Sequence, residues 1–161
     1  MGKVYQMIVQ VCTALYGRSA AERYHYCMTE VSFLPILLAG IVSFILGYAW
    51  YHPRVFGGVW MRLANVQPEN VERGARQMSI SAPVALLGSM LVAYVMSYFG
   101  IAWGVYDIIG AIKLGFWCWL GFVAPTMLGQ VLWEHRPFTL YLLNALYWLV
   151  SFIVMAIILL F

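Results

Sequence analysis

The stretch from Val31 to Arg62 reads VSFLPILLAGIVSFILGYAWYHPRVFGGVWMR and decides the class of protein. Its first part, 31–51, carries no charged side chain, and about twenty apolar residues are what a helix needs to cross the hydrocarbon core of a bilayer. Aromatic residues, a proline and arginines follow within a few positions, which is typical of a helix that leaves the membrane at headgroup level. We therefore expect an integral membrane protein whose first span is 31–51.

The composition supports the same class. Of the 161 residues, 64% are hydrophobic and 9% are charged, and the mean hydropathy is +0.84. A soluble domain carries about 25% charged residues, so lipid must be the solvent for much of this chain. The formal net charge of +3 is small and dispersed, whereas nucleic-acid binding needs basic residues clustered on one face. We expect no nucleic-acid partner.

Three more apolar segments follow the first, at 79–100, 108–133 and 138–161. The predicted fold is therefore an all-α integral membrane protein, with four transmembrane helices in one domain over 31–161. Residues 1–30 form an N-terminal extension whose apolar positions recur at helical spacing, in a run too short to span a bilayer. This pattern predicts a short amphipathic helix that lies at the interface or against a partner.

The links between the spans predict an orientation. Four alternating spans place the links 52–78 and 133–137 on one side of the membrane, and these links carry most of the arginines. Because positively charged links are retained in the cytoplasm, we expect both links there and both termini on the opposite side.

Small residues predict how the helices pack. Lipid tails are as apolar as leucine, so helices in a bilayer associate by close packing of small residues, and residues four apart share a helix face. Such rows occur in the first two spans, and we expect them to face each other or neighbouring helices. The rows are Ala39, Ser43 and Gly47 in the first span and Ser81, Ala85, Ser89, Ala93 and Ser97 in the second.

The last two spans differ in kind. Pro125 removes a backbone donor and should kink the third span near Gly121. The fourth span is bulky, and we expect it to face lipid along much of its length. Thr126, Gln130 and Asn144 are uncharged polar residues inside these apolar runs, and we expect them to form hydrogen bonds between helices.

Ionisable residues near the spans are candidates for function because charge is costly in lipid. A polar site could involve Arg54, Lys113 and Arg136. For Lys113 we favour a side chain that reaches back to the interface, and for Asp107 a helix cap.

Two imidazoles and a carboxylate, those of His52, Glu134 and His135, could bind a metal. No spacing fixes these three on one element, so we favour a belt of ion pairs and aromatic rings that joins the two links. No nucleophile elbow, phosphate loop or dinucleotide fingerprint is present in the sequence. We expect no enzymatic activity, no metal and no cofactor, and a bound lipid is compatible with the sequence.

The pattern W-Y-x-P-x-x-F-G-x-x-W resembles an uncharacterised family of small bacterial membrane proteins, domain of unknown function 1761. The similarity extends over about residues 33–161, and it implies four spans and a prokaryotic cytoplasmic membrane but no activity. Pro53 and Gly57-Gly58 predict that the chain turns back along the interface, as a re-entrant or interfacial hook over 52–64. The residues that carry the pattern are Trp50, Tyr51, Pro53, Phe56, Gly57 and Trp60.

Three functions are compatible with these observations. The first is a small interaction or structural subunit that assembles with identical copies or with the subunits of a larger membrane complex, its partners being lipids and other transmembrane helices. The second is a small carrier or binding protein for a lipid or an apolar solute, with a pocket opened at Pro125. The third is a metal-dependent membrane enzyme that uses His52, Glu134 and His135.

Overall fold

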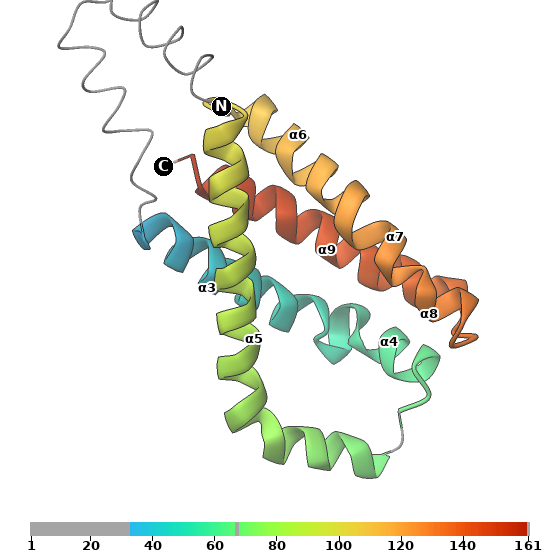
Figure 1. Ribbon diagram of the computed structural model, residues 1–161. Helices are drawn as coiled ribbons and strands as arrows, with labels where there is room; N and C mark the ends of the chain where they lie inside the picture. The colour runs from blue at the N-terminus through green and yellow to red at the C-terminus, as the bar shows by residue number, and fades with distance from the viewer. Residues whose placement is uncertain (1–32, 67, 161) are drawn as a thin grey trace, which may run out of the picture. The chain divides into compact units, whose positions relative to one another are not determined.

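The computed structural model describes residues 33–66 and 68–160, apart from the side chains of 68–73 and 75, and every regular element in it is a helix (Figure 1). Four helical segments are long and apolar enough to cross a membrane: Phe33–Trp50, Arg76–Ala102, Ile108–Leu132 and Phe138–Ile158. The predicted all-α fold with four spans is confirmed. The extension at 1–30, with its expected amphipathic helix, lies outside the described residues.

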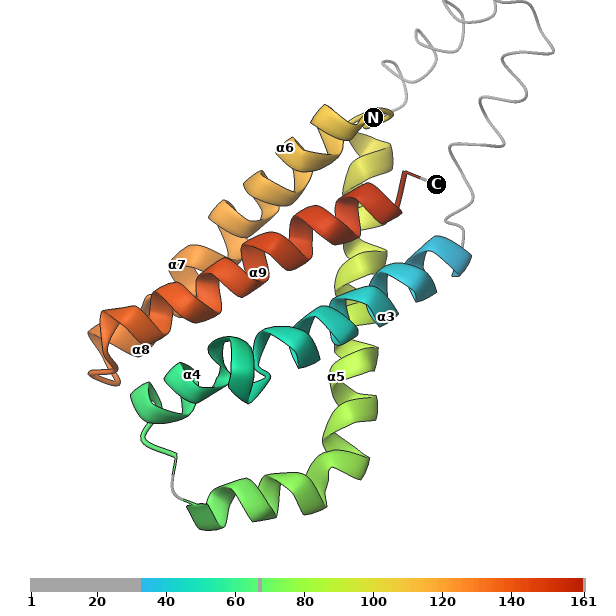
Figure 2. The same cartoon turned by 180° about the vertical axis from the view of Figure 1, so that it is seen from behind.

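Helix α3 (Phe33–Trp50) ends where the sequence predicts, and a π-turn η1 (Pro53–Gly57) and a short helix α4 (Gly58–Leu63) follow it. Pro53 has no N–H to continue the helix, and His52 before it is extended, with φ −66° and ψ 138°. Beyond this break α4 runs on past the end of α3 (Figures 1 and 2). The expected hook is therefore wrong in one respect, because the chain does not turn back. Gly57 and Gly58 adopt ordinary right-handed helical angles, which do not reverse a chain.

Helix α5 (Pro68–Ala102) is much longer than the predicted second span of 79–100. The segment expected as a polar link is the first part of the same helix, because its carboxylates at Glu69 and Glu72 suit the positive end of a helix dipole. Pro83 therefore lies inside the helix rather than in its first turn. A proline at this position cannot donate to the carbonyl of Ser79. Helix α5 also bends between its first part and its spanning part (Figure 1).

The turn between α5 and α6 (Ile108–Cys118) is built from local signals. Gly104 has φ +64°, which an L side chain rarely adopts. Its N–H donates to the carbonyl of Ile101, and the N–H of Val105 donates to Gly100, so the last carbonyls of α5 are satisfied. Asp107 then caps α6 by accepting from the Gly110 N–H at 3.2 Å, which confirms its predicted role.

The third span is interrupted as Pro125 predicts. After α6 it continues as a π-turn η2 (Trp119–Val123), then as α7 (Ala124–Met127) and α8 (Gly129–Leu132). The hydroxyl of Thr126 lies 2.6 Å from the carbonyl oxygen of Phe122 and 2.9 Å from that of Val123. Thr126 therefore satisfies carbonyls of its own helix, and the expected bond to another helix is wrong for this residue.

Helix α9 (Phe138–Ile158) lies between α3 and the third span, whereas α5 crosses them (Figures 1 and 2). Within their most apolar stretches, 44% of the residues of α9 are buried, compared with 22% for the first span, 17% for the second and 28% for the third. The expectation that the last span faces lipid is therefore wrong. Its bulky side chains pack against small residues of the neighbouring helices, so bulk on α9 did not indicate exposure.

Candidate functional site

Two of the three buried polar side chains among the described residues, those of Ser43 and Ser151, lie where α3 packs against α9. We call the group of hydrogen-bonded polar side chains at this contact the polar seam. Its members are neutral side chains that bond across the two helices. They are Ser43 and Tyr51 on α3 and the turn after it, and Asn144, Tyr147 and Ser151 on α9.

Ser43 and Ser151 form the centre of the polar seam. Their hydroxyl oxygens lie 2.6 Å apart, and both side chains are fully buried. A hydroxyl in lipid has no water to bond, so an internal partner satisfies it. Sequence analysis placed Ser43 at a helix contact but did not identify Ser151.

Tyr147 lies one helical turn further along the polar seam. Its hydroxyl donates to the backbone carbonyl of Ser43 at 3.4 Å. Gly47 provides the space for the ring, because a Cβ at this position would lie 2.8 Å from the tyrosine oxygen. The glycine in the small-residue row of the first span therefore receives a large side chain of α9.

Tyr51 and Asn144 close the polar seam at the end of α3. The phenol of Tyr51 donates to Oδ1 of Asn144 at 2.9 Å, so the interhelical hydrogen bond expected of Asn144 is confirmed. Burial, with a smaller contribution from Tyr147, raises the pKa of the Tyr51 phenol above its ordinary value. The proton that donates to Asn144 is therefore held more firmly than in an exposed tyrosine.

Aromatic residues at the end of α3 and in the turns after it place their rings around this end of the polar seam. The ring of Trp50 lies 4.7 Å from that of Phe56, and the ring of Tyr51 lies 5.8 Å from that of Trp60. The N–H of Gly57 donates to the His52 carbonyl at 3.0 Å, and a Cβ on Gly57 would collide with the carbonyl of Tyr51. A glycine is required here for the π-turn to close.

Trp50 carries a buried donor without an acceptor among the described residues. Its indole nitrogen is buried and has no hydrogen-bond partner within the described residues. The ring packs between Phe56 and Tyr147, at centroid distances of 4.7 and 6.2 Å. The indole therefore contributes through its apolar surface.

The opposite side of α9 is bonded to the third span. The indole N–H of Trp119 donates to the carbonyl of Ala145 at 2.8 Å, and the hydroxyl of Tyr141 donates to the carbonyl of Ala124 at 3.2 Å. Gly115 lets the two helices approach closely, because a Cβ there would lie 2.8 Å from the Cα of Ile153. These contacts hold the interrupted third span against α9.

The small residues of the two rows differ in burial and in the helix that they face. Ala39 and Ser43 are buried and Gly47 is half-buried, and Ser43 and Gly47 face α9 rather than α5. The closest approach of α3 to α5 is made by Gly40, where a Cβ would lie 3.3 Å from the Cα of Met90. In the row of α5, Ser89 and Ala93 are buried, Ser97 is half-buried, and Ser81 and Ala85 are exposed.

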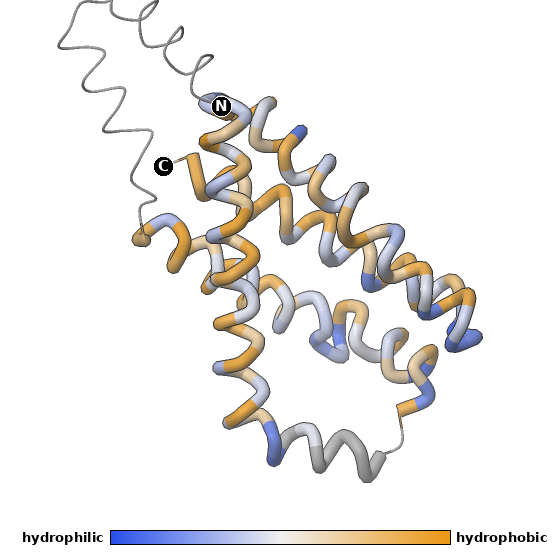
Figure 3. The backbone as a smooth tube through the Cα atoms, in the orientation of Figure 1, coloured by the Kyte–Doolittle hydropathy of each residue, from blue (hydrophilic) through white to orange (hydrophobic). Residues whose placement is uncertain are grey.

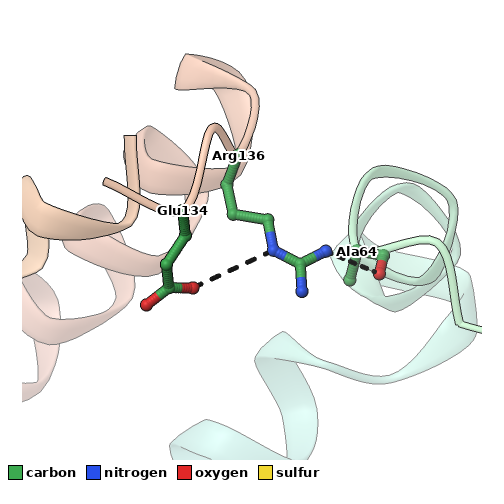
Figure 4. Close-up of polar contacts among 3 residues, drawn as sticks. All are labelled: Ala64, Glu134 and Arg136. Carbon is green, nitrogen blue, oxygen red and sulfur yellow. Dashed lines mark hydrogen bonds and ion pairs between the residues drawn. The ribbon is translucent and has the colours of Figure 1, made fainter. Parts of the chain in front are cut away.

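The two arginine-bearing links meet at one end of the bundle. Arg136 donates from a terminal guanidinium nitrogen to the carbonyl of Ala64 at 3.4 Å, and its Nε lies 4.0 Å from a carboxylate oxygen of Glu134 (Figure 4). Ala64 caps the C-terminal end of α4, where a cation is favourable. The links at 52–78 and 133–137 therefore lie at the same end, as four alternating spans require.

The other polar candidates do not converge on a site. Nδ1 of His52 accepts from the backbone N–H of Arg54 at 3.3 Å, which is a local helix cap. Glu134 and His135 are exposed, and within the described residues no three His, Cys, Asp or Glu side chains come together to hold a metal. Lys113 is also exposed, on α6.

Two of the three side chains that α9 contributes to the polar seam, those of Tyr147 and Ser151, were not predicted from the sequence. Asn144, Tyr147 and Ser151 recur at spacings of three and four, which places them on one helix face. That spacing was a usable signal, because polar side chains on one face of an apolar helix indicate a helix contact. Only Asn144 was recognised.

Four apolar helices, joined by neutral hydrogen bonds and close glycine contacts, define the protein as a multi-pass, four-helix integral membrane protein. The chain belongs to the family described as protein of unknown function (DUF1761), which it matches over residues 34–160. No curated protein and no solved structure matches the chain.

Proposed function

We propose that this protein is a small membrane interaction subunit that assembles through α5, either with copies of itself or as an accessory subunit of a larger complex. The observation that carries this proposal is the uncovered state of α5. Only 17% of its most apolar stretch is buried, the lowest share of the four spans.

The uncovered face of α5 has a regular pattern. Large apolar side chains recur every three or four residues, with Ile80 71% exposed and Leu91 64% exposed. Spacings that alternate between four and three place side chains on one stripe, as in paired helices. The stripe consists of Ile80, Val84, Leu87, Leu91, Tyr94 and Tyr98.

Small residues beside this stripe leave room for a partner backbone. Ser81, Ala85 and Gly88 are exposed, and a Cβ on Gly88 would meet no atom within 4 Å. In contrast, the glycines that face α9 and α5 within the bundle are filled by neighbouring side chains or backbone. Small residues on a bilayer helix favour close approach of another helix.

We prefer this function to that of a solute carrier because of the bonding near Pro125. The three carbonyls that directly precede this proline, those of Phe122, Val123 and Ala124, accept from the hydroxyls of Thr126 and Tyr141. They are therefore poor candidates for a solute-binding group.

We further propose a prokaryotic cytoplasmic membrane as the location, with the links 52–78 and 133–137 in the cytoplasm and both termini opposite. Exposed arginines at Arg54, Arg62 and Arg136 lie on these links, and positive charge is retained on the cytoplasmic side. Cysteine accessibility labelling at Asn65 and Trp103, from each side of the membrane, tests this orientation.

The assembly is tested by native mass spectrometry of protein that is gently extracted from its own membrane. A mass that is a multiple of 18.3 kDa indicates self-assembly, and a larger mass with foreign subunits indicates an accessory role. A wild-type protein that is monomeric contradicts the proposal.

A matched pair of variants shows whether α5 is the contact. Gly88→Leu and Gly74→Leu both add a side chain where no atom lies within 4 Å, but only Gly88 lies in the spanning part, Arg76–Ala102. We expect Gly88→Leu to release the partner and Gly74→Leu to retain it. Equal behaviour of the two variants would remove α5 from the contact.

A further inference from the structure

Exposed cations are concentrated at one end of the described structure. At the end formed by α4 and the α8–α9 turn, Arg54, Arg62 and Arg136 are exposed, and Glu134 is the only acidic residue there whose side chain is described. Strongly hydrophilic positions lie in the last turn of α4 and in the α8–α9 turn (Figure 3). The opposite end carries Asp107 and Lys113, whose charges cancel.

Arg136 is held in place at this end and still has donors to offer. Its contacts with Ala64 and Glu134 hold the guanidinium at the last turn of α4, which also carries Arg62 (Figure 4). The contact with Ala64 uses one of the five N–H donors of the guanidinium, and the 4.0 Å ion pair with Glu134 is longer than a hydrogen bond. The remaining donors form a planar fork that matches the oxygens of a phosphate group.

Apolar side chains at the same end indicate the depth of these arginines in the membrane. Trp133 directly precedes Glu134 and is 82% exposed. Phe138, two residues after Arg136, and Val59, one helical turn before Arg62, are also exposed. Exposed tryptophan and phenylalanine at the ends of spans lie at the membrane interface. The guanidinium groups therefore lie where lipid phosphates are found, with apolar surface for the acyl chains next to them.

We infer that this end of the protein binds the headgroup of an anionic phospholipid, through Arg62 and Arg136 with Arg54 adding charge. A zwitterionic headgroup offers the same phosphate but carries a cation of its own, which the arginines repel. A free phosphate ion lacks the acyl chains that the exposed Trp133 and Phe138 would contact. This inference depends on the membrane class of the protein and not on its assembly.

The inference is tested by native mass spectrometry of the full-length protein in detergent, titrated with phosphatidylglycerol or with phosphatidylcholine. We expect phosphatidylglycerol to bind more tightly than phosphatidylcholine. Each arginine-to-glutamine substitution should weaken the affinity for phosphatidylglycerol about fivefold, because one arginine near an anionic surface contributes about 1 kcal/mol. The variants are Arg62→Gln and Arg136→Gln, with Lys113→Gln as the matched control at the opposite end.

One further variant and one competitor complete the test. Arg136→Lys keeps the charge but loses the planar fork, so it should bind the lipid with an affinity between those of the wild type and Arg136→Gln. Equal affinity for the two lipids, or equal loss in Lys113→Gln, would overturn the inference. If millimolar inorganic phosphate displaces phosphatidylglycerol, the site recognises phosphate alone, and the inference that a lipid is the ligand is wrong. Melting temperatures within one or two degrees of wild type, on the order expected for surface changes, exclude misfolding as the cause of a loss.

Discussion

Helices α9 and α5 are both long and apolar, yet the structure uses them in opposite ways. In their most apolar stretches 44% of α9 is buried, compared with 17% of α5. Helix α9 is bonded to α3 by the polar seam and to the third span by Trp119 and Tyr141. Helix α5 crosses its neighbours and leaves a long stripe of large side chains uncovered.

Hydropathy alone therefore does not locate the core of a membrane protein. Lipid accepts apolar side chains as readily as a protein interior does, so burial is decided by shape and by polar partners. Helix α9 is buried because Gly115 and Gly47 on its neighbours make room for it. Helix α5 has its own small residues, Ser81, Ala85 and Gly88, open to the outside.

Truncation of one large side chain on each helix should give the largest contrast. Met155 on α9 is fully buried, whereas Leu91 on α5 is 64% exposed. Met155→Ala leaves a cavity and should lower the free energy of unfolding by about 3 kcal/mol, while Leu91→Ala should change it by less than about 0.5 kcal/mol. Unfolding by sodium dodecyl sulfate, followed by circular dichroism, measures both. Equal losses would mean that α5 is as well packed as α9.

Addition of one methyl group to a glycine tests the close contact of α9 with the third span. Gly115→Ala places a Cβ 2.9 Å from the carbonyl oxygen of Phe152, and backbone must move to accept it. The expected loss of stability is about 2 kcal/mol. Gly121→Ala is the matched control in the same span, because a Cβ there meets no atom within 4 Å. A neutral Gly115→Ala would show that the two helices pack less closely than described.

Removal of the central hydroxyls tests the polar seam. Ser43→Ala or Ser151→Ala leaves the other hydroxyl buried without its partner at 2.6 Å, which should cost about 1 to 2 kcal/mol. The double variant should cost less than the sum of the single ones, with a coupling of about 0.6 kcal/mol. Ser81→Ala on the exposed face of α5 should be neutral. Additive losses at Ser43 and Ser151 would contradict the hydrogen bond.

The smallest expected effect lies at the end of the polar seam. Tyr51→Phe removes the hydrogen bond to Asn144 and should cost about 0.6 kcal/mol at neutral pH. Because burial raises the pKa of this phenol, the folded state holds its proton more tightly than the unfolded state does. The stability that depends on it is complete below about pH 10 and is lost as the pH rises further. Unfolding curves between neutral pH and pH 11 should therefore converge for wild type and variant, and parallel curves would contradict the raised pKa.

Much of the fold could be predicted from the sequence because its signals are local. Charge-free apolar runs predicted the four spans, and Pro53 predicted the end of α3. Asp107 predicted the start of α6, and Pro125 predicted the irregular turn that precedes this proline. The first part of α5 was missed, because a polar segment outside the bilayer carries no hydropathy signal even when it is helical.

The site was predictable only in part, because each of its contacts joins residues about a hundred positions apart in the chain. Tyr51 and Asn144 were each recognised as notable, but their pairing was not, and Ser151 was not recognised at all. A serine in an apolar run has the same local appearance whether its partner is another helix or its own backbone, as Thr126 shows.

The sequence by itself determined that this chain crosses a membrane four times, where each span begins and ends within a few residues, and which end carries the arginines. These properties depend on the transfer of single segments from water to lipid, and each segment contains its own signal. Only the tertiary structure decided that α9 is the central helix, that Ser43 meets Ser151, and that α5 remains uncovered. In a bilayer every apolar face is acceptable to lipid, so the choice among faces depends on the shapes and polar groups that distant helices bring together.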